Sequence, residues 1–333
     1  MSKFRVVMID YDYESIEPIG KPIVEAGGEF EGRKCKNLDE ALEFAKAADG
    51  VIIQYLGPAA DRMFTELPNL KVVARMGIGL DPIDVESATR HGVAVVNVPS
   101  YCEDEVSDQA MALLLACARK IVFFNNQVQS GGWDFNEARP IRRLRGQTMG
   151  LLGLGKIPRA LAPKAQAFGF KVIAHDPYVK AEDAQAIGVK LVDFDTLLAE
   201  SDFLSIHCPL LDSTRGMMNA EAFAKMKPSA VVINTARGPI IDEAALAAAI
   251  KSRKLGGAGL DVLTDEPPKP SNPLLHLSEV VIAPHVGFFS EESLNELLTK
   301  AGLYTAEVLQ GKRPEGLANP DVLGTAQARV KLG

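Results

Sequence analysis

Four polar side chains follow apolar runs in the second half of the chain, and together they could oxidise or reduce a small acid. Arg237 comes after "AVVINT", Asp261 and Glu266 come after "GGAGL", and His285 comes after "VVIAP". Hydride transfer to a carbonyl needs a proton donor at the reacting oxygen and a cation that holds a carboxylate, which histidine and arginine can supply. Each residue taken alone could equally be structural, in a surface pair or a turn.

A glycine-rich stretch at residues 153–158, "GLGKIP", could hold a dinucleotide. Glycines at 153 and 155 permit a tight turn and close approach of the backbone to a pyrophosphate, and a helix that begins at about Lys156 offers free N–H groups. Asp176 lies 21 residues beyond Gly155, where an acidic residue accepts hydrogen bonds from the ribose of NAD. A turn without a ligand would explain these six residues equally well if they stood alone.

Pro158 stands where the third glycine of such a motif is expected. In the first helical turn a proline fits the backbone, because its missing N–H has no partner inside the helix. The replacement removes one potential phosphate donor and the close contact between helix and sheet, so we expect a slightly displaced helix and a working site. The carboxylate at Asp176 favours NAD over NADP because it repels a 2′-phosphate, although Lys180 leaves NADP open.

The elements that must position these residues alternate along the whole chain. Continuous apolar, β-branched runs predict strands covered on both faces, as in a parallel α/β sheet. Two consecutive series predict two doubly wound, Rossmann-like α/β domains with a cleft between them. The first series has strands at 5–9, 50–54, 71–74 and 93–97, followed by one long helix at 103–129; the second has strands at 148–155, 171–175, 202–207, 230–235, 256–263 and 280–285, with helices at 156–168, 193–200, 219–226 and 242–252.

Composition restricts the class of protein. The chain has 333 residues, 47% of them hydrophobic, and a net charge of −7 that is dispersed, which argues against nucleic acid and anionic membranes as partners. Four scattered cysteines without a C-x-x-C pair make a metal site unexpected and fit a reducing cytoplasm. The apolar run at the start is too short for a signal peptide.

Six stretches, in this order, resemble the D-isomer-specific 2-hydroxyacid dehydrogenases, NAD-dependent enzymes of two Rossmann-like domains. The resemblance covers nearly the whole chain, and several stretches are most similar to the branch that contains the C-terminal-binding proteins. The stretches are "RMGIGLDPID" (75–84), "NVPSYCEDEVSDQAMALLLACAR" (97–119), "HCPLLDST" (207–214), "INTARGPIIDEAAL" (233–246), "GLDVLTDEPP" (259–268) and "PHVGFFSEES" (284–293).

The resemblance implies a domain organisation and three catalytic roles. Residues 1–100 and 290–333 would form a discontinuous substrate domain, and residues 101–289 an inserted NAD-binding Rossmann domain. His285 would be the general acid–base, Glu266 its hydrogen-bond partner, and Arg237 the group that binds the substrate carboxylate and carbonyl. A carboxylate beside a histidine stabilises the protonated ring, which keeps a proton available for a 2-oxo oxygen.

The resemblance also implies which residues line the cofactor and the substrate. Asp261 would lie by the nicotinamide amide. The substrate carboxylate would be held by backbone amides around Gly77, Ile78 and Gly79, in the loop that begins at Arg75. The expected cofactor-binding residues are Gly153, Gly155, Lys156, Ile157, Asp176, Cys208, Thr235, Ala236, Arg237, Asp261 and His285.

The implied activity is hydride transfer between NAD(H) and a small D-2-hydroxy acid or 2-oxo acid, such as glyoxylate, hydroxypyruvate or a sugar acid. The alternative is an NAD(H)-responsive binding module of the corepressor type with little turnover, because such relatives can retain the same three residues. A homodimer is implied too, with the 103–129 helix and "SGGWDF" (130–135) near its interface.

Two features depart from the branch or invite another chemistry. Phe288 and Phe289 stand where the C-terminal-binding proteins carry a tryptophan; they could line an apolar side of the substrate pocket, or one of them could be buried. His207 and Cys208 are adjacent on a predicted strand, so they point to opposite faces and do not form a nucleophile pair.

Overall fold

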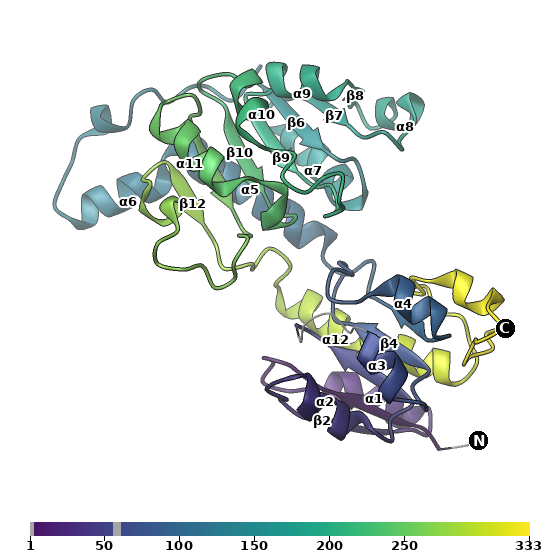
Figure 1. Ribbon diagram of the computed structural model, residues 1–333. Helices are drawn as coiled ribbons and strands as arrows, with labels where there is room; N and C mark the ends of the chain where they lie inside the picture. Colours follow the sequence, from purple (N-terminus) through teal and green to yellow (C-terminus); the bar gives the residue numbers. More distant parts are fainter. Residues whose placement is uncertain (1–2, 56–60) are drawn as a thin grey trace. The chain divides into compact units, whose positions relative to one another are not determined.

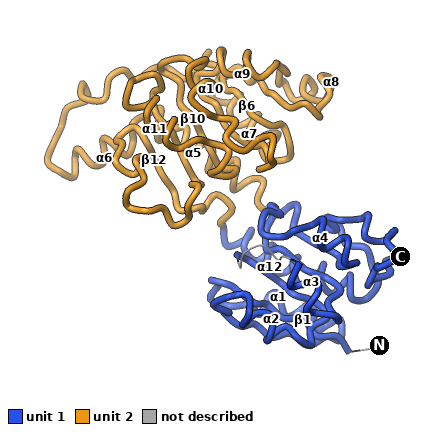
Figure 2. Tube along the Cα trace, viewed as in Figure 1, with its two compact units in different colours: residues 1–101, 290–333 blue, residues 102–289 orange. Residues whose placement is uncertain are grey.

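The computed structural model describes residues 3–55 and 61–333, which divide into two compact units. Unit 1 consists of Met1–Tyr101 and Ser290–Gly333, and unit 2 of Cys102–Phe289 (Figure 2). Each unit has its own parallel β-sheet with helices on both faces, so the α/β, doubly wound class predicted from the sequence is confirmed.

Unit 1 has a five-stranded sheet in the order β2-β1-β3-β4-β5. Alternate strand residues enter two cores: Val7, Val51 and Val73 face one layer of helices, whereas Val6, Ile52 and Val72 face the other. The strands are β1 (Arg5–Met8), β2 (Glu29–Gly32), β3 (Gly50–Ile53), β4 (Val72–Arg75) and β5 (Ala94–Val96); one face carries α2 (Leu38–Ala45), α3 (Asp61–Glu66) and α4 (Val85–Arg90), and the other carries α1 (Glu17–Glu25) and α12 (Glu291–Leu309).

Unit 2 has a seven-stranded sheet in the order β12-β11-β10-β9-β6-β7-β8 (Figure 1). Counted from β6, this is the Rossmann order, which reverses direction between β6 and β9. The strands are β6 (Thr148–Leu152), β7 (Lys171–His175), β8 (Lys190–Leu191), β9 (Phe203–Ile206), β10 (Val231–Asn234), β11 (Gly257–Leu260) and β12 (Val280–Ile282); the helices are α5 (Glu103–Arg119), α6 (Ile121–Gln129), α7 (Lys156–Ala167), α8 (Ala181–Gln185), α9 (Phe194–Glu200), α10 (Ala220–Lys225) and α11 (Glu243–Lys251).

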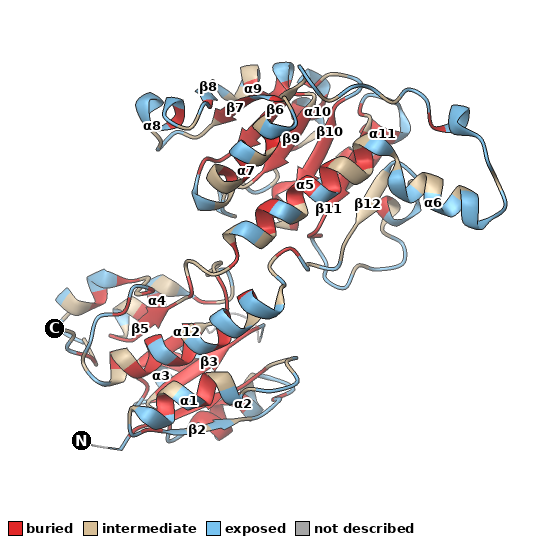
Figure 3. Cartoon of the chain, turned by 180° about the vertical axis from the view of Figure 1, so that it is seen from behind, coloured by how far each residue is buried: buried red, intermediate tan, exposed pale blue. Residues whose placement is uncertain are grey.

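The single helix predicted for residues 103–129 is wrong. Lys120 adopts a left-handed conformation (φ 55°, ψ 38°) and separates α5 from α6. Figure 3 shows α5 with a buried face along the sheet of unit 2, whereas every residue of α6 is exposed or half-buried. The break ends the helix where its contacts with the sheet end.

Two strands were not expected from the sequence. The strand β2 reads "EFEG" and lies at the edge of its sheet with exposed glutamates, and β8 has only two residues. Short, polar edge strands lack the continuous apolar pattern by which buried parallel strands are recognised.

The helices of residues 3–55 and 61–333 are each too short or too polar to span a lipid bilayer. Within the same residues, His, Cys, Asp and Glu side chains do not gather in groups of three or more that could hold a metal ion.

Candidate active site

A histidine in an unusual backbone conformation follows the last strand of unit 2. His285 has φ 53°, a left-handed value that is uncommon for residues other than glycine. Its N–H donates to the carbonyl of Asp261 at 2.7 Å, and its Nδ1 lies 2.7 Å from Oε2 of Glu266. The side chains of His285 and Glu266 are 39% and 38% exposed, so both remain accessible from solvent in unit 2.

The carboxylate of Glu266 is held from two sides. Its Oε1 accepts a hydrogen bond from the Leu263 N–H at 2.9 Å, while Oε2 faces His285. Burial raises the pKa of Glu266, but the hydrogen bond and charge of His285, the Leu263 amide and the charge of Arg237 outweigh it and hold that pKa below its ordinary value. Glu266 is therefore ionised at neutral pH and can stabilise a protonated imidazole.

Arg237 is presented by a loop that a buried asparagine closes. Asn234, at the end of β10, accepts from the Ala236 N–H at 3.0 Å and donates from Nδ2 to the Arg237 carbonyl at 2.9 Å. The next residue, Gly238, lies so close to the Leu263 backbone that a Cβ would be 2.0 Å from its carbonyl carbon. This contact holds the arginine loop against the segment that carries Glu266.

Asp261 ties the ends of three neighbouring strands together. It is 2% exposed, and its N–H donates to the Asn234 carbonyl at 2.9 Å. Its Oδ1 accepts from the Val286 N–H at 3.1 Å and its Oδ2 from the Gly287 N–H at 2.8 Å. The arrangement couples β10, β11 and the turn that carries His285.

The glycine-rich stretch lies where the sheet order of unit 2 reverses. Gly153 has φ 95°, and a Cβ there would be 2.9 Å from the Cys208 nitrogen, so only glycine fits between the ends of β6 and β9. A Cβ on Gly155, in contrast, would have no described neighbour within 4 Å. The protein itself does not require glycine at 155, and the free space suits a ligand that approaches the backbone.

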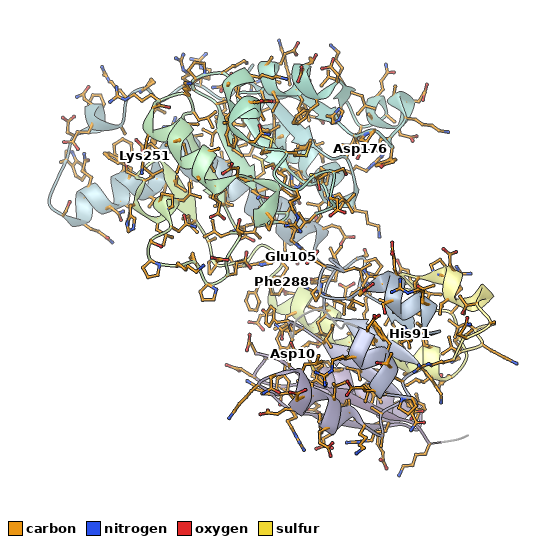
Figure 4. The ribbon with its side chains drawn as sticks, viewed as in Figure 1. Asp10, His91, Glu105, Asp176, Lys251 and Phe288 are labelled. Carbon is orange, nitrogen blue, oxygen red and sulfur yellow. The ribbon has the colours of Figure 1, made fainter. Side chains whose placement is uncertain are left out.

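Asp176, labelled in Figure 4, follows β7. Two backbone amides orient its carboxylate. Its Oδ2 accepts from the Leu154 N–H at 2.8 Å, and its Oδ1 from the Tyr178 N–H at 2.9 Å. The first of these bonds places the carboxylate beside the glycine turn, as a partner for ribose hydroxyls must be.

Two further observations fit a bound dinucleotide. Helix α7 begins after Gly155 without a side-chain cap from any described residue, so the amides of Lys156 and Ile157 remain available for a phosphate. Thr235 Oγ1 is buried and has no hydrogen-bond partner among the residues that the structure describes. Buried polar atoms are normally paired, so an unpaired one at the end of β10 suits a group that the ligand completes.

Comparison with known proteins identifies the family. The sequence profile of the D-isomer specific 2-hydroxyacid dehydrogenase, NAD binding domain, matches residues 111–287. The chain belongs to the D-isomer-specific 2-hydroxyacid dehydrogenase family. Unit 2 is the NAD-binding domain of this family of oxidoreductases, and the family and cofactor predicted from the sequence are thereby confirmed.

Named relatives of the family span a range of acids. D-3-phosphoglycerate dehydrogenase of Methanocaldococcus jannaschii is 38% identical over 298 residues, which are 89% of this chain but 56% of that protein, so the chain spans about half of that relative. Glyoxylate reductase of Korarchaeum cryptofilum is 35% identical over 286 residues, covering 85% of this chain and 86% of that one.

A solved structure shares the fold over most of its length. It is the NAD-complexed form of a D-isomer specific 2-hydroxyacid dehydrogenase from Lactobacillus delbrueckii ssp. bulgaricus. The TM-score is 0.80 at 25% identity, with 94% of this chain and 100% of that chain covered. Both NAD-binding and fold predictions agree with this likeness.

The expected substrate loop of this dehydrogenase family lies in unit 1. Gly77 has φ 129°, and the Arg75 side chain lies against it, because a Cβ on Gly77 would meet Nη1 at 2.0 Å. The carbonyls of Gly77 and Ile78 accept from the Val98 N–H and from Asn97 Nδ2, at 3.1 and 2.7 Å. These bonds fix the loop backbone, and the role predicted for residues 75–79 stays a prediction.

His207 and Cys208, which are adjacent in unit 2, are both shifted away from reactive protonation states by burial. Burial lowers the pKa of His207 to about 3, and its Nε2 lies 2.8 Å from Ser205 Oγ. Burial also raises the pKa of Cys208 to about 11. A neutral imidazole beside a protonated thiol does not make an activated nucleophile.

Sequence reasoning missed two residues that shape this site. Asn234 could have been noticed as a polar residue that closes the apolar run "AVVIN". Gln109, on α5, donates from Nε2 to Asp261 Oδ1 at 3.0 Å. It is 152 residues away in sequence, and no local pattern distinguishes it from a solvent-facing glutamine.

Proposed function

We propose that this chain is an NAD-dependent dehydrogenase that interconverts a small 2-oxo acid and the corresponding D-2-hydroxy acid. The observation that carries the proposal is the 2.7 Å contact between His285 Nδ1 and Glu266 Oε2, next to the loop that presents Arg237. An imidazole oriented by a carboxylate, beside a guanidinium, is what proton transfer to the carbonyl of an anionic substrate requires.

The proton carrier would be His285. Because Nδ1 faces Glu266, the other ring nitrogen, Nε2, is left to face the substrate and give its proton to the 2-oxo oxygen. NADH, when bound, supplies the hydride that C2 of the substrate receives. In the opposite direction neutral His285 takes the proton of the hydroxyl group, and Glu266 stabilises the imidazolium that forms.

In unit 2, substrate would be oriented by Arg237. A guanidinium can grip a planar carboxylate with two parallel hydrogen bonds, which a lysine cannot reproduce. Arg237 is half-buried, and its Nη1 donates to the Ala236 carbonyl at 2.7 Å, which restrains the side chain.

The acid is expected to be small. Named relatives include a glyoxylate reductase, a hydroxypyruvate reductase and D-3-phosphoglycerate dehydrogenases. Glyoxylate and hydroxypyruvate are our first candidates. NAD is expected to be preferred to NADP, because the Asp176 carboxylate would repel a 2′-phosphate.

A homodimer through α6 and the segment after it is part of this proposal. Ile121, Trp133 and Phe135 are 57%, 88% and 70% exposed in unit 2. Large apolar side chains gathered on one protruding segment mark an interaction surface, and a second copy offers the same segment in return. We expect sedimentation to give the mass of two chains, and Trp133→Glu to shift the protein towards monomer.

Four free cysteines fit a reducing compartment such as the cytoplasm.

The deciding experiment is the fall in NADH absorbance with purified protein across a panel of 2-oxo acids, repeated with NADPH. We expect turnover of at least one acid with NADH, and His285→Asn to lower kcat by ~10²–10⁴-fold while NADH binding persists. His276→Asn is the matched control, because His276 is an exposed histidine of the same unit that contacts only the Pro270 carbonyl in the hydrogen bonds described. NADH binding without turnover of any acid would favour the corepressor-like binding module.

A further inference from the structure

Gln109 reaches the active-site segment of unit 2 from a different element. It lies on α5, which packs against β10, β11 and β12. Its Nε2 donates to Asp261 Oδ1 at 3.0 Å, and the side chain is half-buried. A neutral amide is thus the side-chain donor to a carboxylate that is itself 2% exposed.

Asp261, the hydrogen-bond partner of Gln109, fixes the backbone of residues 285–287. Asp261 accepts the N–H groups of Val286 and Gly287 on its two carboxylate oxygens, and the His285 N–H on its carbonyl. Three consecutive backbone amides therefore end on one residue. Such a set of bonds is what keeps a residue with a side chain at a positive φ.

Gln109 also contacts the turn directly. A Cβ on Gly287 would lie 2.7 Å from Asp261 Oδ2 and 3.3 Å from Gln109 Cγ. The glycine is thus enclosed between the carboxylate and the glutamine side chain. A shift of either side chain opens space beside the turn.

We propose that Gln109 is a positioning residue for His285: its amide fixes the Asp261 carboxylate, which holds residues 285–287 so that the imidazole meets Glu266. The proposal rests on the function proposed above, in which His285 carries the proton. Gln109 itself touches neither substrate nor cofactor in this scheme. Without its amide donor, the carboxylate can rotate and the turn can leave its left-handed conformation.

The charged groups around this turn come from two neighbouring segments. Glu266 and Asp261 belong to the segment after β11, and Arg237 to the segment after β10. A looser turn moves the imidazole away from Glu266, so the carboxylate stabilises the protonated ring less well. The ring should then leave the position in which its Nδ1 lies 2.7 Å from Oε2 of Glu266.

The test is the NMR spectrum of the ligand-free chain, read at the backbone amide signals of Val286 and Gly287, which donate to Asp261. We expect Gln109→Leu to shift both signals, because the carboxylate that accepts these hydrogen bonds can rotate. With an active 2-oxo acid, kcat should fall about tenfold while the KM for NADH changes less than about twofold.

Gln166→Leu is the matched control. Gln166 lies on α7, and its Nε2 donates to the carbonyls of Ile187 and Gly188, away from the His285 turn. Its removal should leave the Val286 and Gly287 amide signals and kcat unchanged. Unchanged amide signals in Gln109→Leu would overturn the inference whether or not the wild type turns over. Shifted signals in a protein without dehydrogenase activity would support the inference and reject the proposed function.

A second variant keeps the inference testable if Gln109→Leu does not fold. Gln109→Glu preserves length but places a second carboxylate beside Asp261, where like charges raise the pKa of one of them. At about pH 8 the two groups repel, and by about pH 5 one shared proton restores the hydrogen bond. The Gly287 amide signal should differ from the wild type at the higher pH and coincide with it at the lower. A difference that persists equally at both would reject the role.

Discussion

The two units of this protein differ at the carboxyl ends of their parallel strands. A buried side chain occupies this position in unit 1, and glycines occupy it in unit 2. In unit 1 the strand order reverses between β1 and β3, and in unit 2 between β6 and β9. Ligands of open α/β sheets bind at such points, outside the carboxyl ends of the strands. In unit 1 Asp10 occupies this place and accepts the N–H groups of Gln54 and Tyr55. In unit 2 the place is taken by Gly153 and Gly155.

The difference shows that a reversal of strand order provides a possible ligand site in both units. The residues after the first strand decide whether a protein side chain or a ligand occupies that site. A buried carboxylate such as Asp10, which is 8% exposed, satisfies backbone amides from within the protein. In unit 2 the space beside Gly155 is free of described neighbours, and the amides of Lys156 and Ile157 that follow have no side-chain cap from the described residues, which suits a ligand. The carboxyl ends of the strands are therefore filled by the protein's own carboxylate in unit 1, and in unit 2 they suit a nucleotide.

The largest effect is expected on NADH affinity when a side chain fills the free space at Gly155 in unit 2. Gly155→Val places a side chain in space with no described neighbour within 4 Å, at an extended backbone (φ −76°, ψ −159°) that any residue adopts. We expect NADH affinity to fall about 100-fold, which is about 2.7 kcal/mol, since the side chain occupies the path of the pyrophosphate. The free energy of unfolding should change by less than about 1 kcal/mol. Fluorescence titration with NADH and chemical denaturation measure the two quantities.

Gly324→Val is the control for this substitution in unit 1. A Cβ on Gly324 likewise would meet no described atom within 4 Å, but no cofactor is expected there. Its NADH affinity should equal that of the wild type. Equal affinities for wild type and Gly155→Val would mean that the free space at 155 is not where the cofactor lies.

Much of the fold could be predicted from the sequence because the strands of parallel sheets are continuous apolar runs. The runs at 5–9, 50–54, 171–175 and 230–235 each contain an observed strand. The break at Lys120 could not be predicted, because lysine is a good helix former and its left-handed conformation depends on where the sheet ends beneath the helix. The edge strands β2 and β8 were missed because β2 alternates exposed glutamates with half-buried residues and β8 has only two residues, so neither is a continuous apolar run.

Less of the site could be predicted from local pattern. The residue types at 237, 266 and 285 suggested proton transfer, but only their joint resemblance to a known family distinguished them from surface residues. The positive φ of His285 depends on three amides that end on Asp261, and the partner of that carboxylate comes from 152 residues away. Contacts of such separation follow from the folded sheet and leave no periodic signal in the chain.

Removing the Asp10 carboxylate from unit 1 should lower the free energy of unfolding and leave the cofactor site of unit 2 intact. Asp10→Ala leaves the amides of Gln54 and Tyr55 without their acceptor, so we expect the free energy of unfolding to fall by about 2 kcal/mol. NADH affinity should stay within about twofold of the wild type, because Asp10 lies in unit 1 and the glycine turn in unit 2. Denaturation followed by circular dichroism gives the first quantity. Asp12→Ala, an exposed carboxylate in the same loop, is the control and should be near neutral.

Glu266 fixes the local backbone, as Asp10 does, and also contacts the proposed proton carrier. Its Oε1 accepts the Leu263 N–H, and its Oε2 faces Nδ1 of His285. Its pKa is lowered in the folded protein, so its stabilising contribution is fully present above the pKa of the unfolded chain and is lost as pH falls through the folded pKa. The stability difference between wild type and Glu266→Gln should therefore be constant near neutrality and shrink in acid. The same variant should lower kcat about tenfold, as its amide stabilises the imidazolium poorly. A stability difference that grows in acid would contradict the assignment.

The smallest effect is expected at Pro158, the residue that interrupts the glycine pattern. It occupies the third position of α7 and is buried, so the first turn of this helix offers one backbone donor fewer to a nucleotide. Pro158→Gly and Pro158→Ala both restore an N–H, and only the first removes the side chain. We expect both to leave the Kd for NADH within about tenfold of the wild type, or about 1.4 kcal/mol, since the amides of Lys156 and Ile157 remain. Calorimetry that showed a larger gain in both variants would mean that the proline limits the site. A larger gain in Pro158→Gly alone would assign the limit to the Cβ at this buried position, which alanine keeps and glycine lacks.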